Sequence, residues 1–126
     1  MVLNRDEFIN YVEETYSVTG EHPFTDDNHT TVFRHSENRK WFAIVMTVPH
    51  SRIKLDGGGL IDIVNVKCDP EVIYSFLSEK GMFPAYHMNK RHWITAALDG
   101  TADEDKIKWL LDISYDLTGI KRKNKK

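Results

Sequence analysis

The fold is decided by the stretch IDIVNVKCDPE, residues 61–71. Its first six residues are rich in β-branched side chains and predict a strand, and the next five predict the start of a helix. Asp69 is a residue type that accepts hydrogen bonds from the free amides of a first helical turn, and Pro70 suits the first helical position, where no donor is needed. We expect Gly81 to end this helix and a further strand to cover 92–98.

Working outward toward the N-terminus, residues 4–18 predict a helix. Asn4 and Glu7 have the spacing of a capping box, and apolar residues then recur at four-residue steps. Residues 31–35 and 41–48 predict an antiparallel hairpin, and the second of these strands is apolar on both faces, which favours an inner position in the sheet. The connection over 49–60 contains three consecutive glycines, and we expect it to be mobile and solvent-exposed.

Toward the C-terminus, Thr101 and Glu104 repeat the capping-box spacing ahead of a helix with apolar residues at i, i+3 and i+4, and Gly119 is the expected terminating residue. The predicted order is α-β-β-β-α-β-α, with the last strand allowed to split in two. This order predicts one α+β domain over 1–119, with helices packed against one largely antiparallel sheet. The basic tail over 120–126 is expected to be disordered.

Composition limits the class of protein further. A chain of 126 residues with 40% hydrophobic residues fits one domain with an ordinary core. No apolar run approaches the length of a membrane span, and the N-terminus lacks the layout of a secretion signal. Cys68 is the only cysteine, so no intrachain disulfide can form, and we expect a cytoplasmic protein without a cofactor.

Charge is distributed unevenly along the chain. The tail holds five of the seventeen basic residues, which leaves a body of twelve bases against nineteen acids. Residues 1–30 and 92–119 are acidic, whereas residues 31–91 carry nine bases and six acids. An anionic partner is therefore expected to meet the middle segment or the tail.

Three features that could carry chemistry favour structural interpretations. The glycines of 57–59 lack the following Lys and Ser/Thr of a phosphate loop, so a flexible turn is preferred. The cluster His22, Asp26, Asp27 and His29 lacks zinc-site spacing, and hydrogen-bonding or solvent-facing roles are preferred to a metal site. Cys68 precedes a helix start but has no identified base, so packing is preferred to nucleophilic chemistry.

One cluster is more suggestive of binding. Trp93, with Tyr86 and His87, lies beside Lys90 and Arg91 in the sequence, and aromatic rings interleaved with cations can stack bases and neutralise phosphates. The alternative is that Trp93 supplies one face of a strand and the two cations solvate a turn. The tail is open to the same two interpretations, a solvated end or a contact to an anionic surface.

Several motifs together resemble the YjbR family, also called MmcQ/YjbR. They are KCDPE (67–71), PAYHMNKRHW (84–93), LDG (98–100) and SYDL (114–117), with HPF (22–24) and KWFA (40–43) in the N-terminal half. The resemblance implies a compact α-β(3)-α-β(2)-α domain, described as CyaY-like or likened to secretion chaperones. It also implies DNA binding, a label given to family members on the basis of fold comparison, and it supplies no catalytic motif.

Our leading hypothesis is a small cytosolic binding protein, not an enzyme, that binds DNA weakly through charge. The candidate nucleic-acid contacts are Lys90, Arg91, Trp93, Tyr86 and His87, with Arg39, Lys40 and Lys67 as secondary phosphate contacts. The alternative is a chaperone-like module for a protein partner or a second copy of the chain, which an exposed apolar patch containing Trp41, Trp93 or Trp109 would favour. An enzyme would require His87, His92 and an acidic residue to converge in a pocket.

Overall fold

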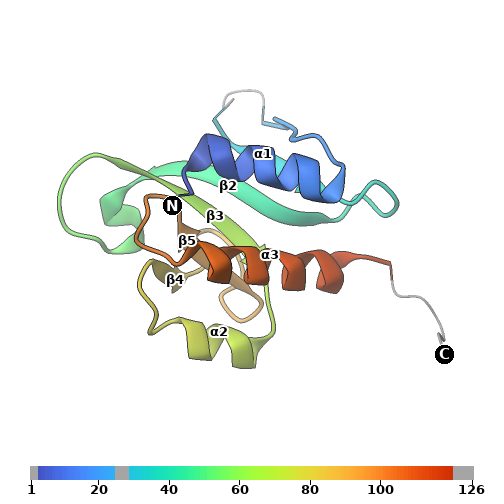
Figure 1. Ribbon diagram of the computed structural model, residues 1–126. Helices are drawn as coiled ribbons and strands as arrows, with labels where there is room; N and C mark the ends of the chain where they lie inside the picture. Colours follow the sequence, from blue (N-terminus) through green and yellow to red (C-terminus); the bar gives the residue numbers. More distant parts are fainter. Residues whose placement is uncertain (1–2, 25–28, 121–126) are drawn as a thin grey trace.

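The computed structural model describes residues 3–24 and 29–120 and contains three α-helices, one 3-10 helix and five strands (Figure 1). In chain order these are α1 (Arg5–Tyr16), β1 (Thr31–Arg34), β2 (Trp41–Pro49), η1 (His50–Ile53), β3 (Leu60–Lys67), α2 (Pro70–Phe76), β4 (Met82–Pro84), β5 (Trp93–Ala97) and α3 (Glu104–Thr118). The α+β class, the order of the elements and the split of the last strand are confirmed.

The five strands form one antiparallel sheet in the order β1-β2-β3-β5-β4. β2 is an inner strand, as its two apolar faces predicted. The decisive stretch supplies β3 at the centre, paired with β2 along one side and β5 along the other. The register places Asn65 directly opposite Thr95 and Lys67 directly opposite Trp93.

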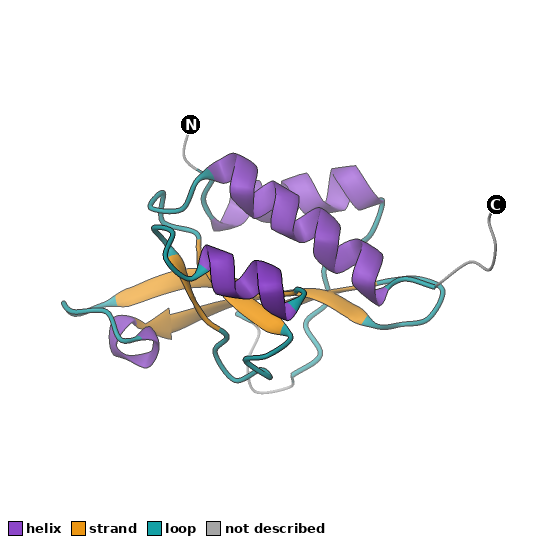
Figure 2. Ribbon diagram, turned by 90° about the horizontal axis from the view of Figure 1, so that it is seen from below, coloured by secondary structure: helices purple, strands orange, loops and turns teal. Residues whose placement is uncertain are grey.

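The three α-helices bury their apolar residues against one face of the sheet. Figure 2 shows the two long helices, α1 and α3, lying together on one side of the strands. The core between the layers joins Phe8 and Val12 of α1 and Leu111 of α3 to Val64 and Val66 of β3. All five side chains are nearly or completely buried, and burying a side chain of this size stabilises the fold by roughly 1.5–3 kcal/mol.

The opposite face of the sheet, called here the second face, carries a smaller core. Val48, Ile61, Ile63 and Ala97 are buried there, and Ile53 of η1 packs onto them. Phe83 and Tyr86 complete the cluster from β4 and the segment that follows it. The sequence had suggested that the segment 49–60 is solvent-exposed. The structure differs, because Ile53 in this segment is buried and anchors η1 to the sheet.

Three helix ends also differ from the sequence-based expectation. Asp69 precedes α2, but its side chain caps no amide, and α2 ends at Phe76 rather than near Gly81. The cap of α3 is Asp103, whose carboxylate accepts from the amides of residues 105 and 106. Thr101 instead bonds Asp99. At the other end of α3 the expectation is confirmed, because Gly119 directly follows the last helical residue, with a φ of −76°.

The N-terminal cap is as expected. The Asn4 side chain accepts from the Glu7 amide, and the Glu7 carboxylate accepts from the Asn4 amide, which completes a capping box. Among the described helices, none is long and apolar enough to cross a lipid bilayer. The expected disordered tail falls, apart from Ile120, outside the described residues.

Candidate nucleic-acid interface

A cleft of about 360 Å³ lies on the second face between η1 and the segment after β4. Its lining residues are Arg52, Ile53, Lys54, Phe83, Pro84, Ala85, Tyr86 and Lys90. Apolar and aromatic groups make up most of the wall, and three cations complete it. No described acidic residue lines this cleft, so its electrostatic potential favours an anion.

Two buried polar side chains hold one wall of the cleft in place. Asn65 and Thr95 are 1% and 0% exposed. The Asn65 side-chain amide donates to the Tyr86 carbonyl (2.9 Å), and the Tyr86 amide donates to the Thr95 hydroxyl (2.9 Å). The Thr95 hydroxyl donates in turn to the Asn65 side-chain oxygen. Both backbone groups of Tyr86 are therefore bonded to the sheet. These bonds fix the start of the loop that leads from β4 to β5.

The rest of the loop is closed by short-range hydrogen bonds. The Lys90 ammonium donates to the Ala85 carbonyl at 2.9 Å, which links the two ends of a six-residue segment. The Asn89 side chain accepts from the Arg91 amide at 2.8 Å, an arrangement that stabilises tight turns. His87 has a φ of +60°, and its ring contacts the Tyr86 ring with centroids 4.1 Å apart.

The neighbouring residues in the sequence do not share one site. Tyr86 and Lys90 line the cleft, whereas Arg91 lines a separate hollow with Asp69 and Glu71. Lys90 and Arg91, which the sequence placed side by side, thus serve different surfaces. His87 is exposed next to the cleft without lining it.

Lys67 and Trp93 extend the candidate surface along the second face. They are half-buried and pair across β3 and β5. Each lies two residues from the Asn65–Thr95 pair, so their side chains share its face of the sheet at a distance of roughly 7 Å along the strands. The pair therefore neighbours the segment held by Tyr86.

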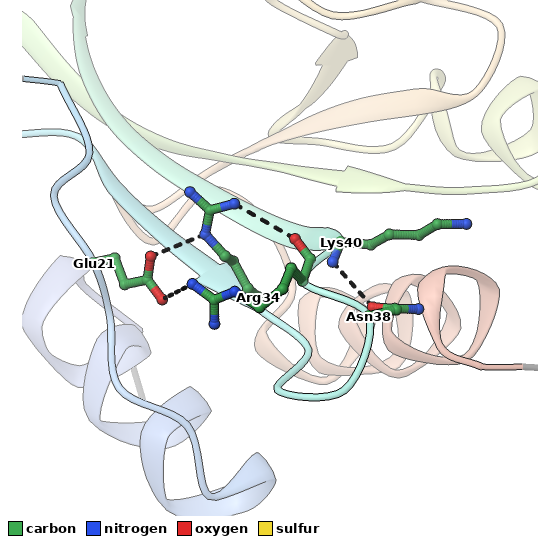
Figure 3. Close-up of polar contacts among 5 residues, drawn as sticks. Glu21, Arg34, Asn38 and Lys40 are labelled. Carbon is green, nitrogen blue, oxygen red and sulfur yellow. Dashed lines mark hydrogen bonds and ion pairs between the residues drawn. The ribbon is translucent and has the colours of Figure 1, made fainter.

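The hairpin tip between β1 and β2 is electrostatically different. The Glu21 carboxylate bonds the Arg34 guanidinium at 2.9 Å and the Arg39 guanidinium at 3.2 Å (Figure 3). The hydrogen bond from Arg34 is the largest cause that lowers the pKa of Glu21 below its ordinary value. Lys40 is exposed beside this cluster. The secondary contact expected at Arg39 is thus already engaged by a carboxylate.

Ion pairing separates these cations into two groups. Within the described residues, salt bridges involve Arg34, Arg39, Lys106 and Lys108. The described cations without a carboxylate partner include Lys40, Arg52, Lys54, Lys67, Lys90 and Arg91. Arg52 and Lys54 were not among the sequence-based candidates. They lie in a segment expected to be mobile, and no sequence pattern indicated that it would fold beside residues 83–90.

The structural interpretations of Cys68 and of the three glycines fit their surroundings. Burial raises the pKa of the Cys68 thiol to about 11, so the thiol is protonated at neutral pH and packs in the core. The three glycines connect η1 to β3 with open space around them. No cluster of three His, Cys, Asp or Glu side chains suited to a metal occurs among the described residues. Asp26 and Asp27 lie outside the described residues.

Comparison with known proteins identifies the family. The YjbR family model matches residues 13–117. The chain belongs to the YjbR family. Protein YyaQ of Bacillus subtilis is 35% identical over 117 residues, which cover 93% of this chain and 99% of that protein. Protein YjbR of Escherichia coli K12 is 36% identical over 53 residues, covering 41% and 45% of the two chains.

Solved structures of similar chains have the same architecture. A crystal structure of a Pseudomonas syringae protein matches with a TM-score of 0.90 at 39% identity and covers 92% of this chain and 99% of that one. A crystal structure of a Deinococcus radiodurans protein matches with a TM-score of 0.65 at 26% identity, covering 92% and 78%. The family and the fold are thus established together.

Proposed function

We propose that this YjbR-family protein binds single-stranded DNA weakly through its second face. The observation that carries the proposal is the alternation of aromatic rings and carboxylate-free cations along that face. Lys67 and Trp93 neighbour the segment that Tyr86 begins, and the cleft beyond it adds Lys90, Lys54 and Arg52. Half-exposed rings can stack on unpaired bases, and the cations can neutralise phosphates.

The distribution of acids supports this orientation. α1, α3 and the Asp103 cap contain nine of the nineteen acidic residues, and these elements lie on the other side of the sheet. The helix layer would repel a polyanion, whereas the second face offers it four cations. The low affinity follows from the small number of phosphate contacts.

The test is the affinity for a single-stranded oligonucleotide of about 12 nucleotides, measured by fluorescence anisotropy across a salt series. Four phosphate contacts predict a slope of about −3 for log affinity against log salt, and Lys67→Ala should reduce its magnitude by about 0.7. Trp93→Ala should weaken binding by about 1–3 kcal/mol. Lys106→Ala removes the same charge from the helix side and is the matched control, expected to leave the slope unchanged.

Absence of binding at low salt would contradict the proposal. So would a slope that Lys67→Ala and Lys106→Ala reduce equally, since the charge on one face would then have no special role. Tighter binding to duplex than to single-stranded DNA would argue against the stacking role of Trp93.

A second candidate is self-association through the helix layer. Trp109 of α3 is 51% exposed, and its ring stacks on Phe76 of α2 with centroids 5.5 Å apart. Leu77, which is 38% exposed, follows Phe76 directly. An exposed aromatic stack of this kind favours a protein partner. A homodimer that sedimentation equilibrium detects and Trp109→Lys dissociates would support this candidate, and a monomer at high concentration would exclude it.

A further inference from the structure

We infer that the cleft between η1 and β4 is a binding site for one small aromatic phosphate, of the nucleoside monophosphate class. Its volume of about 360 Å³ lies in the range of about 300–1,000 Å³ typical of small-molecule sites. Ile53, Phe83 and Pro84 give it apolar walls. Mostly apolar walls with a few well-placed polar groups are what such sites have in common.

The cations select the anionic part of the ligand. Arg52, Lys54 and Lys90 line the cleft, and no described carboxylate competes for them there. Lys90 donates one hydrogen bond to the Ala85 carbonyl, so its ammonium is held near the cleft with two further donors. A guanidinium and two ammonium groups suit a phosphate, which accepts several charge-assisted hydrogen bonds at once.

The aromatic walls select the ring. Phe83 and Tyr86 both line the cleft and pack on the second face. The backbone of Tyr86 is held at both its amide and its carbonyl by buried side chains. The wall is therefore formed before a ligand arrives, and little conformational entropy is lost when a planar ring binds against it.

The backbone conformation of Lys54 allows its role in the cleft to be tested. Lys54 has a φ of +63°, in the left-handed region where residues with a Cβ are strained and glycine is not. Arg39 has the same φ at the hairpin tip, away from the cleft lining. Replacing either residue by glycine relieves comparable strain, but only Lys54→Gly removes a cation from the cleft.

The inference rests on the proposed function because both use the second face. It deepens that function by naming a nucleoside monophosphate as the ligand of the cleft. Its ligand is nevertheless a free small molecule, so the two can fail separately. The path of DNA depends in addition on Lys67 and Trp93, which do not line the cleft. The cleft depends on Lys54 and Tyr86.

The experiment is calorimetric titration of the full chain with adenosine 5′-monophosphate, adenosine and inorganic phosphate, alongside thermal unfolding. We expect the monophosphate to bind at least about tenfold more tightly than either fragment, because ring and phosphate are both held. Lys54→Gly should weaken the monophosphate about tenfold while raising the unfolding temperature. Arg39→Gly should leave this affinity unchanged, and any rise in its unfolding temperature should be smaller because this variant also loses the ion pair with Glu21.

The outcomes separate the two proposals. Equal affinities for the monophosphate and inorganic phosphate would overturn the inference, as would a Lys54→Gly variant that is more stable and binds as well as the native chain. Monophosphate binding without oligonucleotide binding would support the inference and contradict the proposed function. Oligonucleotide binding without monophosphate binding would do the reverse.

Discussion

The hairpin tip and the second-face cleft are both basic, but they differ in whether a carboxylate pairs with their cations. At the hairpin tip one carboxylate, Glu21, bonds both Arg34 and Arg39. In the cleft three cations lie among aromatic and apolar groups, with no described carboxylate in the lining. The two regions thus differ in the position of a single acid rather than in the presence of bases, and we expect this position to decide which region binds an anion.

The two regions also differ in how they are held. Tyr86 is bonded through its backbone to the completely buried Asn65–Thr95 pair. The hairpin tip is held by Asn38, which is only half-buried, donates to the Thr118 carbonyl at 2.8 Å and accepts from the Lys40 amide at 3.0 Å. Asn65 thus makes its bonds inside the packed structure, whereas Asn38 makes its bonds partly at the surface. The buried His35 ring, at the start of the tip, also bonds the Tyr115 carbonyl and the Thr118 hydroxyl.

The largest expected effect tests this difference in attachment. Asn65→Ala leaves the Tyr86 carbonyl and the Thr95 hydroxyl without their buried partner, and should lower the free energy of unfolding by about 3 kcal/mol. Asn38→Ala, the matched asparagine at the hairpin tip, should cost about 1 kcal/mol because water can replace its bonds. Urea unfolding measures both values. Equal losses would show that the cleft wall is no more firmly held than the tip.

A second change should make the two regions alike. Glu21→Gln removes the carboxylate between the guanidinium groups, so Arg34 and Arg39 become available to phosphates. We expect affinity for single-stranded DNA to rise about threefold to tenfold and the salt dependence to steepen by about 0.7 for each phosphate gained. Fluorescence anisotropy across a salt series measures both. Unchanged affinity and slope would mean that ion pairing does not control which cations bind.

The smallest expected effect is the pH dependence of the hairpin tip. Hydrogen bonding from Arg34 lowers the pKa of Glu21 in the folded state. A carboxyl with a lowered folded pKa contributes stability above its unfolded pKa, and this contribution is lost as pH falls through the folded value. The stability difference between the native chain and Glu21→Gln should therefore shrink on acidification. A difference that is constant from neutral to acidic pH would contradict this role for the ion pair.

Local patterns in the sequence were sufficient for the elements but not for their ends or for the site. The β-branched residues of β3 and the four-residue periodicity of α1 are properties of the segments themselves, so the sequence alone was enough to predict both elements. The cap of α3 was placed at Thr101 because its spacing to Glu104 fits a capping box, but Asp103, nearer the helix, takes the free amides. Two cap candidates compete at this end, and only the backbone path decides between them.

The site depended on contacts between distant segments. Lys90 and Arg91 are adjacent, but the turn at Asn89 directs them to different hollows. Arg52 and Lys54 join Lys90 only because Ile53 anchors η1 to the second face. The pairing of Glu21 with Arg39 likewise depends on the bridge between residue 21 and β1. None of these placements is determined by spacing along the chain.

The most direct test of the central claim is a ¹H–¹⁵N NMR titration of the full chain with a single-stranded oligonucleotide. We expect the amides of residues 52–54, 86–90 and 93, together with the Trp93 indole, to shift first. The amides of residues 36–40 and of α1 and α3 should remain in place. Shifts concentrated at the hairpin tip or on the helix layer, with the cleft unaffected, would contradict it.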